Sequence, residues 1–138
     1  MYQVVSLPGG DAAAGITEPI QQGEYVRLGS VAFRLVTSAT AGNRQVLVAL
    51  LDGTGTAVFT VAAPAVQAAS LTVDYAFGVE VPAYGSAALG AMGGPLLGCW
   101  LDQNMSLAVI VNTAKAGDVL SNGRMLVEEY ERETDPEA

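Results

Sequence analysis

The chain has 138 residues, a length that suits one domain with a hydrophobic core of its own. Charged residues make up 14% of it, and 14 acidic against 6 basic side chains give a net charge of -8, which argues against nucleic acid and anionic membranes as partners. Histidine is absent, which excludes imidazole metal sites and Ser-His or Cys-His nucleophile pairs.

Residues 1–19 are expected to form a strand or an extended arm ahead of the main domain, residues 20–130. Met1 to Leu7 lacks the basic start and the long apolar run of a secretory signal peptide. The longest uninterrupted apolar stretch, Val46 to Leu51, is far too short to span a bilayer. We therefore expect a soluble protein that does not follow the general secretory route.

The segment Glu24–Thr37 predicts a long strand whose inward face changes phase at Gly29. A bulge at this glycine would add one residue to the strand and bring all of its apolar side chains onto one face. These side chains are even-numbered before the glycine and odd-numbered after it: Val26 and Leu28, then Val31, Phe33 and Leu35.

The next predicted strand, Gln45–Leu51, is apolar on both faces. Both faces need cover, either from the rest of this chain or from a neighbouring one. The turn sequence of residues 52–55 leads into a second alternating run, so residues 45–61 predict a β-hairpin. The two faces of the first strand carry different sets: Val46, Val48 and Leu50 on one, and Leu47, Ala49 and Leu51 on the other.

Three later segments alternate in the same way, and glycines or prolines separate them from their neighbours. Seven or eight short strands at this spacing predict an all-β fold, an antiparallel β-sandwich, of which a jelly roll is one form. The three segments are Ser70–Phe77, Met105–Asn112 and Arg124–Tyr130.

The end of the chain changes character at Glu128, and residues 128–138 contribute -5 of the total charge of -8. We expect residues 131–138 to form a flexible acidic tail, because acidic chain ends are usually solvated. An alternative is an arm that pairs with a basic groove on a neighbouring subunit and becomes ordered on assembly.

The sequence predicts no catalytic, cofactor-binding or metal-binding residues, and we expect the protein not to be an enzyme. The aspartates are scattered singly instead of being spaced as a calcium loop requires, although acids remote in sequence stay open as metal ligands. Cys99, beside Trp100, has no cationic neighbour in the sequence that would lower the pKa of its thiol. Packing is therefore the better interpretation of this cysteine.

The exposed apolar and aromatic residues are expected to form protein interfaces. We expect a homo-oligomer, with a trimer as the favoured form, because the two-faced strand is hard to cover within one small sandwich. Tyr2 to Ser6 is the best candidate for a strand exchanged with a neighbour. A sugar-stacking platform of Tyr2, Tyr84 and Trp100 is a second interpretation. The candidate interface residues are Tyr2, Val4, Leu47, Ala49, Leu51 and Tyr84.

An ordered set of short motifs runs through residues 20–130. It comprises Gly23–Val31, Thr37–Arg44, a Val/Leu strand ending in Asp52-Gly53, Pro64–Phe77 with Gln67–Thr72 at its centre, and Ala116-Gly117-Asp118 followed by Leu126–Glu129. In this order the motifs resemble those of small β-sandwich proteins encoded among the virion genes of tailed bacteriophages. The resemblance implies a non-enzymatic virion component, assembled in the host cytoplasm.

Two placements in the particle follow from this resemblance. The favoured one is a capsid decoration or cement protein that contacts itself and the major capsid protein. The alternative is a neck, tail or fibre accessory protein with receptor or glycan binding. A weakly charged surface rich in small side chains suits repeated protein contacts, and a symmetric lattice lets a modest contact act many times.

Overall fold

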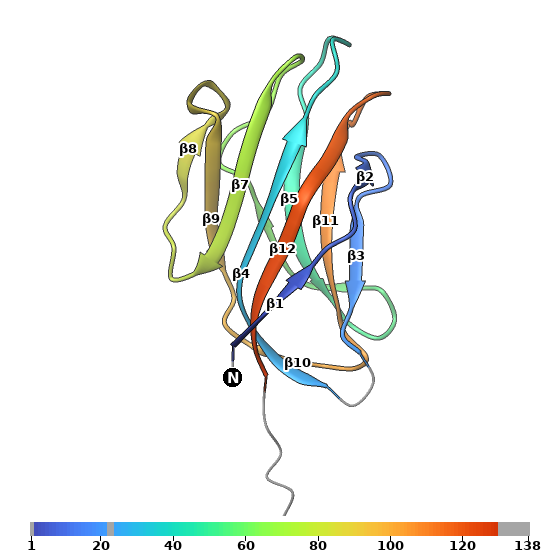
Figure 1. The fold of residues 1–138 in the computed structure, drawn as a ribbon, viewed down its shortest axis with the longest axis vertical. Helices are drawn as coiled ribbons and strands as arrows, with labels where there is room; N and C mark the ends of the chain where they lie inside the picture. Colours follow the sequence, from blue (N-terminus) through green and yellow to red (C-terminus); the bar gives the residue numbers. More distant parts are fainter. Residues whose placement is uncertain (1, 22–23, 130–138) are drawn as a thin grey trace, which may run out of the picture.

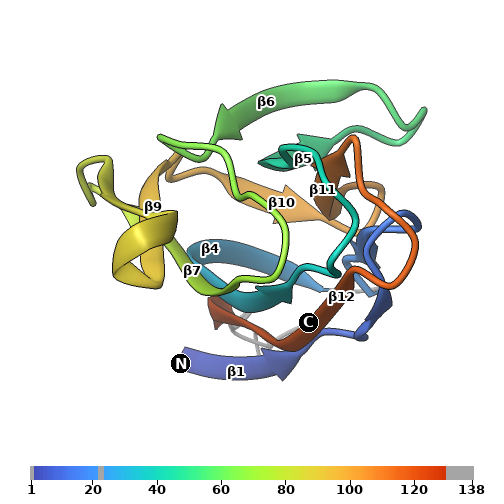
Figure 2. The same cartoon turned by 90° about the horizontal axis from the view of Figure 1, so that it is seen from above.

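Alternation of inward apolar and outward polar or small side chains builds two β-sheets that pack face to face (Figures 1 and 2). The computed structural model describes residues 2–21 and 24–129. Within these residues the smaller sheet has four strands, in spatial order β3 (Ile16–Pro19), β11 (Ser106–Asn112), β5 (Gln45–Leu51) and β6 (Ala57–Ala62). The larger sheet has eight: β1 (Tyr2–Ser6), β12 (Val119–Glu129), β4 (Tyr25–Val36), β7 (Thr72–Val79), β9 (Ala91–Leu96) and β8 (Tyr84–Ser86) in order, with β2 (Gly10–Asp11) beside β12 and β10 (Trp100–Asp102) beside β4.

The predicted all-β fold and β-sandwich are confirmed. The expectation of a wholly antiparallel arrangement is wrong at one pair, because β7 and β9 run parallel. Between β7 and β9 the chain passes through β8, which runs antiparallel to both. β8 pairs with β9 on the side away from β7, and so forms the edge of the sheet. A single 3-10 turn, η1 (Ala87–Leu89), links β8 to β9.

The predicted bulge in β4 is confirmed by its register with β12. Ser30 pairs with Leu126 and Leu28 pairs with Val127, so Gly29 is an extra residue in β4. All five apolar residues of the strand then face the core and are at most 3% exposed. A side chain at Gly29 would lie 3.3 Å from the carbonyl oxygen of Leu126, which also favours glycine at this position.

The last strand begins earlier than predicted, at Val119 instead of Arg124. A second bulge lies between Ser121, which pairs with Arg34, and Arg124, which pairs with Ala32. Asn122 has a φ of 53°, a left-handed conformation that asparagine tolerates better than most residues. The Asn122-Gly123 pair therefore forms a bulge inside the strand and does not precede its first residue.

The N-terminal residues contribute to both sheets. β1 forms an edge of the larger sheet beside β12, and β3 forms an edge of the smaller sheet beside β11. Leu7, Ala12 and Ile16, which lie between or within these strands, are buried in the core. The predicted acidic tail, residues 131–138, lies outside the described residues.

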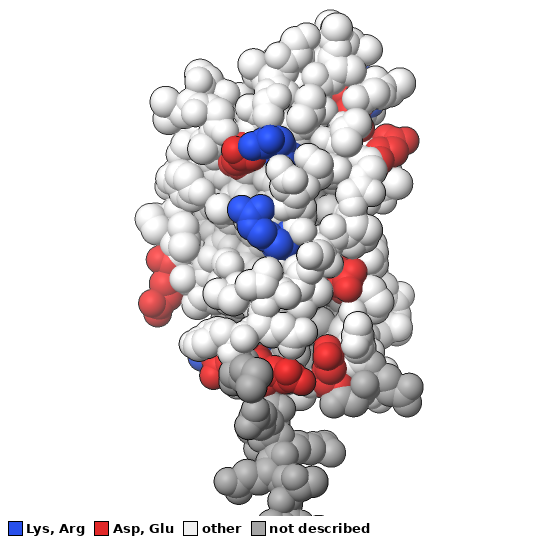
Figure 3. Space-filling model, viewed as in Figure 1, with Lys and Arg blue, Asp and Glu red and all other residues white. Residues whose placement is uncertain are grey.

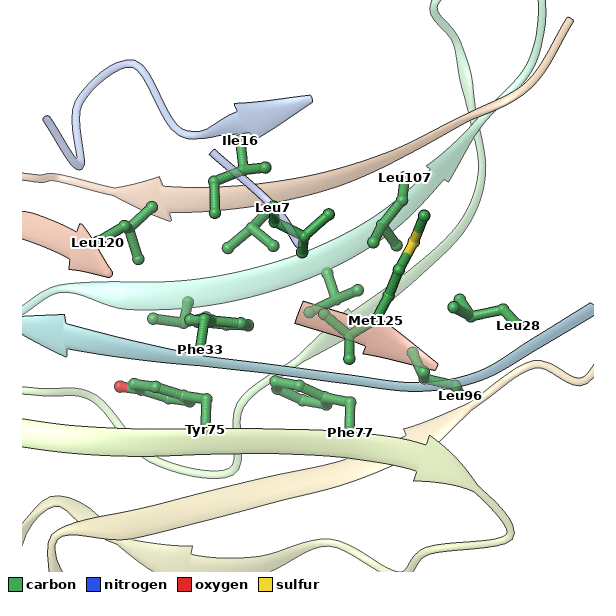
Figure 4. Packing of buried hydrophobic residues seen from close by; sticks show 14 of the residues in the cluster. Leu7, Ile16, Leu28, Phe33, Tyr75, Phe77, Leu96, Leu107, Leu120 and Met125 are labelled. Carbon is green, nitrogen blue, oxygen red and sulfur yellow. The ribbon is translucent and has the colours of Figure 1, made fainter. Parts of the chain in front are cut away.

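Aromatic rings and branched aliphatic side chains from both sheets fill the space between them (Figure 4). Phe33 stacks on Tyr75 with ring centroids 5.2 Å apart, and Phe77 continues the row. Leu107 from the smaller sheet and Met125 from β12 close the core above these rings. Burying a side chain of this size stabilises the fold by about 1.5–3 kcal/mol.

A buried polar network closes one end of the sandwich. Arg44 and Asp118 have fully buried side chains, and the Nε of Arg44 lies 2.8 Å from a carboxylate oxygen of Asp118. The backbone N–H groups of Ser38 and Lys115 also donate to this carboxylate, each at 2.8 Å. Arg44 in turn donates to the carbonyl oxygens of residues 40 and 42.

The pKa of Asp118 reflects two opposing effects. Burial by itself raises the pKa of this carboxyl, but the hydrogen bonds from Arg44, Lys115 and Ser38 outweigh burial and hold it well below the usual range. Asp118 is therefore ionised at neutral pH. The ion pair ties the loop of residues 37–44 to the loop of residues 113–118.

Gln67 extends the network toward the core. Its backbone pairs with Arg44, and its side-chain amide donates to the carbonyl oxygens of Leu35 and Leu71. The hydroxyl of Tyr75 donates to the amide oxygen of Gln67 at 2.8 Å. Every buried side-chain nitrogen and oxygen among the described residues has a hydrogen-bond partner, so the network is structural in character.

Candidate functional site

The outer face of the smaller sheet carries no charged side chain among its described strand residues. Glu18 is the one charged residue in these strands, and it pairs with the inward-facing Leu107. We call this surface the apolar face. Its members are Thr17, Pro19, Gln45, Leu47, Ala49, Leu51, Thr60, Ala62, Ser106, Ala108, Ile110 and Asn112, with the polar pair Gln45 and Asn112 at one end.

The structure brings three predicted interface residues, Leu47, Ala49 and Leu51, together in the middle of the apolar face. Leu47 and Leu51 are half-buried and Ala49 is 1% exposed, because neighbouring side chains on the same face cover them in part. Ile110, opposite Leu47 on β11, is 38% exposed and was missed by the sequence interpretation. The sequence could have identified Ile110, since β11, like β5, carries apolar residues on both of its faces.

The other three predicted interface residues lie elsewhere. Tyr2 and Val4 are 69% and 66% exposed on β1, at one edge of the larger sheet. Tyr84 is 40% exposed on β8, at the opposite edge (Figure 1). The six residues therefore do not form one surface.

The predicted sugar-stacking platform is not formed as a single surface either. Trp100 stacks on Tyr25, with ring centroids 5.1 Å apart, where β10 pairs with β4. Tyr2 and Tyr84 lie on the two opposite edge strands of the larger sheet. Of the three aromatic residues, Tyr84 borders a groove.

This groove lies on the outer face of the larger sheet and has a volume of about 250 Å³. Small side chains form its floor, and polar or aromatic side chains surround them. Figure 3 shows basic side chains in the middle of this largely uncharged face and acidic side chains at its lower end. The outward-facing lining is Ala32, Arg34, Asp74, Ala76, Tyr84, Ala91, Asn122 and Arg124.

An exposed ion pair borders the groove. The Nε of Arg34 lies 2.8 Å from a carboxylate oxygen of Asp74, and a second nitrogen lies 3.3 Å from the other oxygen. Its hydrogen bond from Arg34 lowers the pKa of Asp74, and the same bond raises the pKa of Arg34. Both groups are therefore charged at neutral pH. Sequence reasoning missed both, because they are 40 residues apart and meet through the pairing of β4 with β7.

Within the described residues, no three His, Cys, Asp or Glu side chains gather closely enough to hold a metal ion. Cys99 is half-buried and packs against the core, and burial raises the pKa of its thiol. A thiol with a raised pKa is a weak nucleophile at neutral pH. No helix in the described part of the chain is long and apolar enough to cross a membrane.

The chain shows no match to protein-family models, to curated proteins or to solved structures. The candidate sites are therefore the apolar face of the smaller sheet and the groove on the larger one, each defined by its own residues.

Proposed function

We propose that this protein is a non-enzymatic structural component of a tailed-bacteriophage virion, a capsid decoration protein that stabilises the particle through repeated protein contacts. The observation that carries the proposal is the apolar face, a charge-free sheet surface centred on Leu47, Ala49 and Leu51. Surfaces depleted of charge and flat enough to exclude water are typical of protein interfaces. The phage particle in this proposal is inferred from the sequence resemblance to phage virion proteins.

In this proposal the apolar face is the contact of a homotrimer, and the trimer binds the major capsid protein. The exposed residues of β1, Tyr2 and Val4, provide a second contact, because an edge strand with one neighbour can be exchanged between copies. The acidic residues 131–138 dock on a neighbouring subunit when the particle assembles. Repetition over the lattice makes a modest affinity per contact sufficient.

We also propose that the strand connections are those of a jelly roll. Eight strands remain when the short strands β2, β8 and β10 and the parallel strand β9 are set aside. Numbered in chain order, the first, eighth, third and sixth of them lie side by side in one sheet. The second, seventh, fourth and fifth form the other. Jelly rolls are common in viral capsid proteins and lectins.

The alternative function, a neck, tail or fibre accessory protein with receptor or glycan binding, is favoured by one observation. Tyr84 borders a polar groove on the face opposite the apolar one. The two functions predict different particles. Without a decoration protein, particles assemble but break at lower temperature or internal pressure, whereas without a receptor-binding accessory they are robust but do not attach to cells.

Introducing a charge at position 110 tests whether the apolar face is the contact between copies. Ile110→Asp should convert an oligomer into a monomer in analytical ultracentrifugation, because a buried unpaired carboxylate is costly at an interface. The matched control is Val36→Asp, since Val36 is also β-branched and 38% exposed but lies on the larger sheet. Leu47→Asp and Leu51→Asp should act in the same direction, although both side chains are half-buried in the monomer.

Two results would count against this use of the apolar face. One is a monomer at every concentration, with no change when capsid or tail proteins are added. The other is an Ile110→Asp variant that assembles as the Val36→Asp control does. In either case the face would not be the contact, and the decoration proposal would lose its main support.

A further inference from the structure

The groove on the larger sheet lies along one cross-strand row of very small residues. Ala32 on β4 pairs with Ala76 on β7, and Ala76 pairs with Gly93 on β9. A side chain at Gly93 would overlap the carbonyl oxygen of Ala76, so this position requires glycine. Because cross-strand neighbours share a face of the sheet, Ala32 and Ala76 leave a shallow trough across β4 and β7. The ring of Tyr84 covers Gly93, and its hydroxyl donates to the carbonyl oxygen of Ala76 at 3.4 Å.

Two long side chains end the same row. Arg124 on β12 pairs with Ala32 at one end, and Tyr84 on β8 pairs with Gly93 at the other. Arg124 donates one hydrogen bond to the carbonyl oxygen of Asn122, at 2.8 Å. It forms no ion pair with a carboxylate in the part of the chain that the structure describes. Its guanidinium thus has further donors for an anion.

The neighbouring row carries the ion pair of Arg34 with Asp74. Their side chains are 41% and 58% exposed, so unused guanidinium donors and carboxylate lone pairs face solvent together. The groove therefore offers both donors and acceptors, next to the aromatic ring of Tyr84. Sugar hydroxyls donate and accept at the same time, and the apolar face of a pyranose ring packs on an aromatic ring.

Asp74 also limits what the groove accepts. A strongly acidic peptide, such as the chain's own residues 131–138, would bring several carboxylates toward this ionised aspartate, and like charges repel. A neutral sugar, in contrast, forms no ion pair with the guanidinium of Arg124, whose nearest described carboxylate interaction is the longer-range one with Asp74. A ligand with many hydroxyls and one carboxylate satisfies all of these groups.

We infer that this groove is a binding site for an acidic saccharide, a uronic- or sialic-acid unit. The carboxylate of the sugar binds Arg124, its hydroxyls bind Arg34, Asp74 and Asn122, and its ring packs on Tyr84. The volume of about 250 Å³ is below the roughly 300–1,000 Å³ of pockets for drug-sized ligands, which suits one or two sugar rings.

The site does not depend on the proposed structural function; it deepens the alternative, glycan-binding function by naming the class of sugar that the Tyr84 groove would take. The groove lies on the larger sheet, and the apolar face lies on the smaller one. The wall at Tyr84 and the lining residue Ala91 come from the segment that follows β7 and adds two strands to the edge of the sheet. Without this segment the sheet would end at β7, and the groove would have no second wall.

The test is a binding screen of the whole protein on immobilised saccharides that pairs uronic- and sialic-acid oligosaccharides with their neutral counterparts. Binding should be confined to the acidic members. Hits are then titrated into ¹⁵N-labelled protein, where amide shifts should centre on Ala32, Ala76 and Ala91. Arg124→Gln should weaken the affinity about tenfold or more, because it removes a charge-assisted hydrogen bond.

Two further variants separate a groove effect from a general one. Ala76→Leu fills the trough and should abolish binding, since Ala76 is exposed and its replacement leaves the core intact. The matched control is Thr72→Leu, on the same strand and the same outer face but away from the groove lining, which should bind as the unaltered protein does. Both variants should show unchanged unfolding midpoints.

The inference is overturned if no acidic saccharide binds, or if Ala76→Leu binds as Thr72→Leu does. A synthetic peptide of residues 130–138 that shifts the groove amides, with no saccharide doing so, would assign the groove to the acidic tail and also overturn it. Self-association measured with Ile110→Asp is unaffected by each of these results. Failure of the saccharide site and failure of the structural proposal can therefore be told apart.

Discussion

Two arginine–aspartate pairs in this molecule have the same contact distance and opposite surroundings. Arg44 and Asp118 lie 2.8 Å apart with side chains that are 0% exposed. Arg34 and Asp74 also lie 2.8 Å apart, but their side chains are 41% and 58% exposed. The comparison teaches that burial, and not contact distance, decides whether such a pair stabilises the fold or remains accessible to a ligand.

The buried pair holds loops together, since Asp118 also accepts two backbone N–H groups and Arg44 also donates to two carbonyl oxygens. None of these groups is accessible to a ligand. The exposed pair closes no loop and keeps donors and acceptors facing the groove. The first pair is therefore a structural element, and the second is suited to binding.

The largest effect should come from breaking the buried pair at one partner. Asp118→Ala leaves the guanidinium of Arg44 buried without a counter-charge, which costs about 3–5 kcal/mol of unfolding free energy. That is a large share of the about 5–15 kcal/mol available to a small domain. Urea denaturation followed by tryptophan fluorescence measures it. If the unfolding free energy fell only as much as it does for a substitution at an exposed site, water would have to reach the pair.

Removing both partners together should cost less but should still destabilise the fold. In Arg44→Met with Asp118→Leu no charge is left buried, yet the N–H groups of Ser38 and Lys115 lose their acceptor. We expect a loss of at least about 2 kcal/mol, because unsatisfied buried donors cost about 1–3 kcal/mol each. A double variant as stable as the original protein would show that these N–H groups find other partners.

Acid should weaken the buried pair in a defined pH window. The pKa of Asp118 is lowered in the folded protein, while in the unfolded chain it is near the usual value of about 3.9. Its contribution is therefore complete above that value and is lost as the pH falls toward the folded pKa. We expect this group to account for a loss of about 1 kcal/mol between pH 7 and pH 3.

Asp118→Asn is the control for the acid effect. It cannot titrate, so the variant should show a flatter dependence of unfolding free energy on pH between 5 and 3. The difference between the two profiles isolates Asp118 from Asp52 and Asp74, whose lowered pKa values arise at exposed sites. Parallel profiles would show that Asp118 does not carry the acid sensitivity.

The smallest effect should come from the exposed pair. Asp74→Asn removes the charge but keeps the shape, and because solvent screens the pair, the unfolding midpoint should not change measurably. Saccharide binding should change, since an acceptor in the groove is lost. A clear loss of stability, with binding intact, would reverse the roles that the comparison assigns to the two pairs.

Much of the fold could be predicted from alternation along the strands. In β4 the phase change at Gly29 predicted the bulge, because one extra residue must be added to keep five apolar side chains on one face. The parallel pairing of β7 with β9 could not be predicted. β9 contains Gly93, Gly94 and Pro95, which give no alternation from which a direction could be inferred.

The candidate sites could be predicted less completely. Leu47 and Leu51 were identified because apolar residues on both faces of one strand are visible in sequence. Tyr84 was identified as an exposed aromatic residue, but its neighbours Arg34, Asp74 and Arg124 were not. They come from three strands far apart in the chain, and their meeting depends on register.

The sequence by itself determined the elements of this protein: the all-β class, most strand positions, and the absence of histidine chemistry. These follow from composition and from the period of two, which are local properties. The tertiary structure decided which Arg–Asp pair is buried, which outer face is free of charge, and where a groove opens. Those properties arise because strand order and register, and not sequence spacing, set which side chains become neighbours.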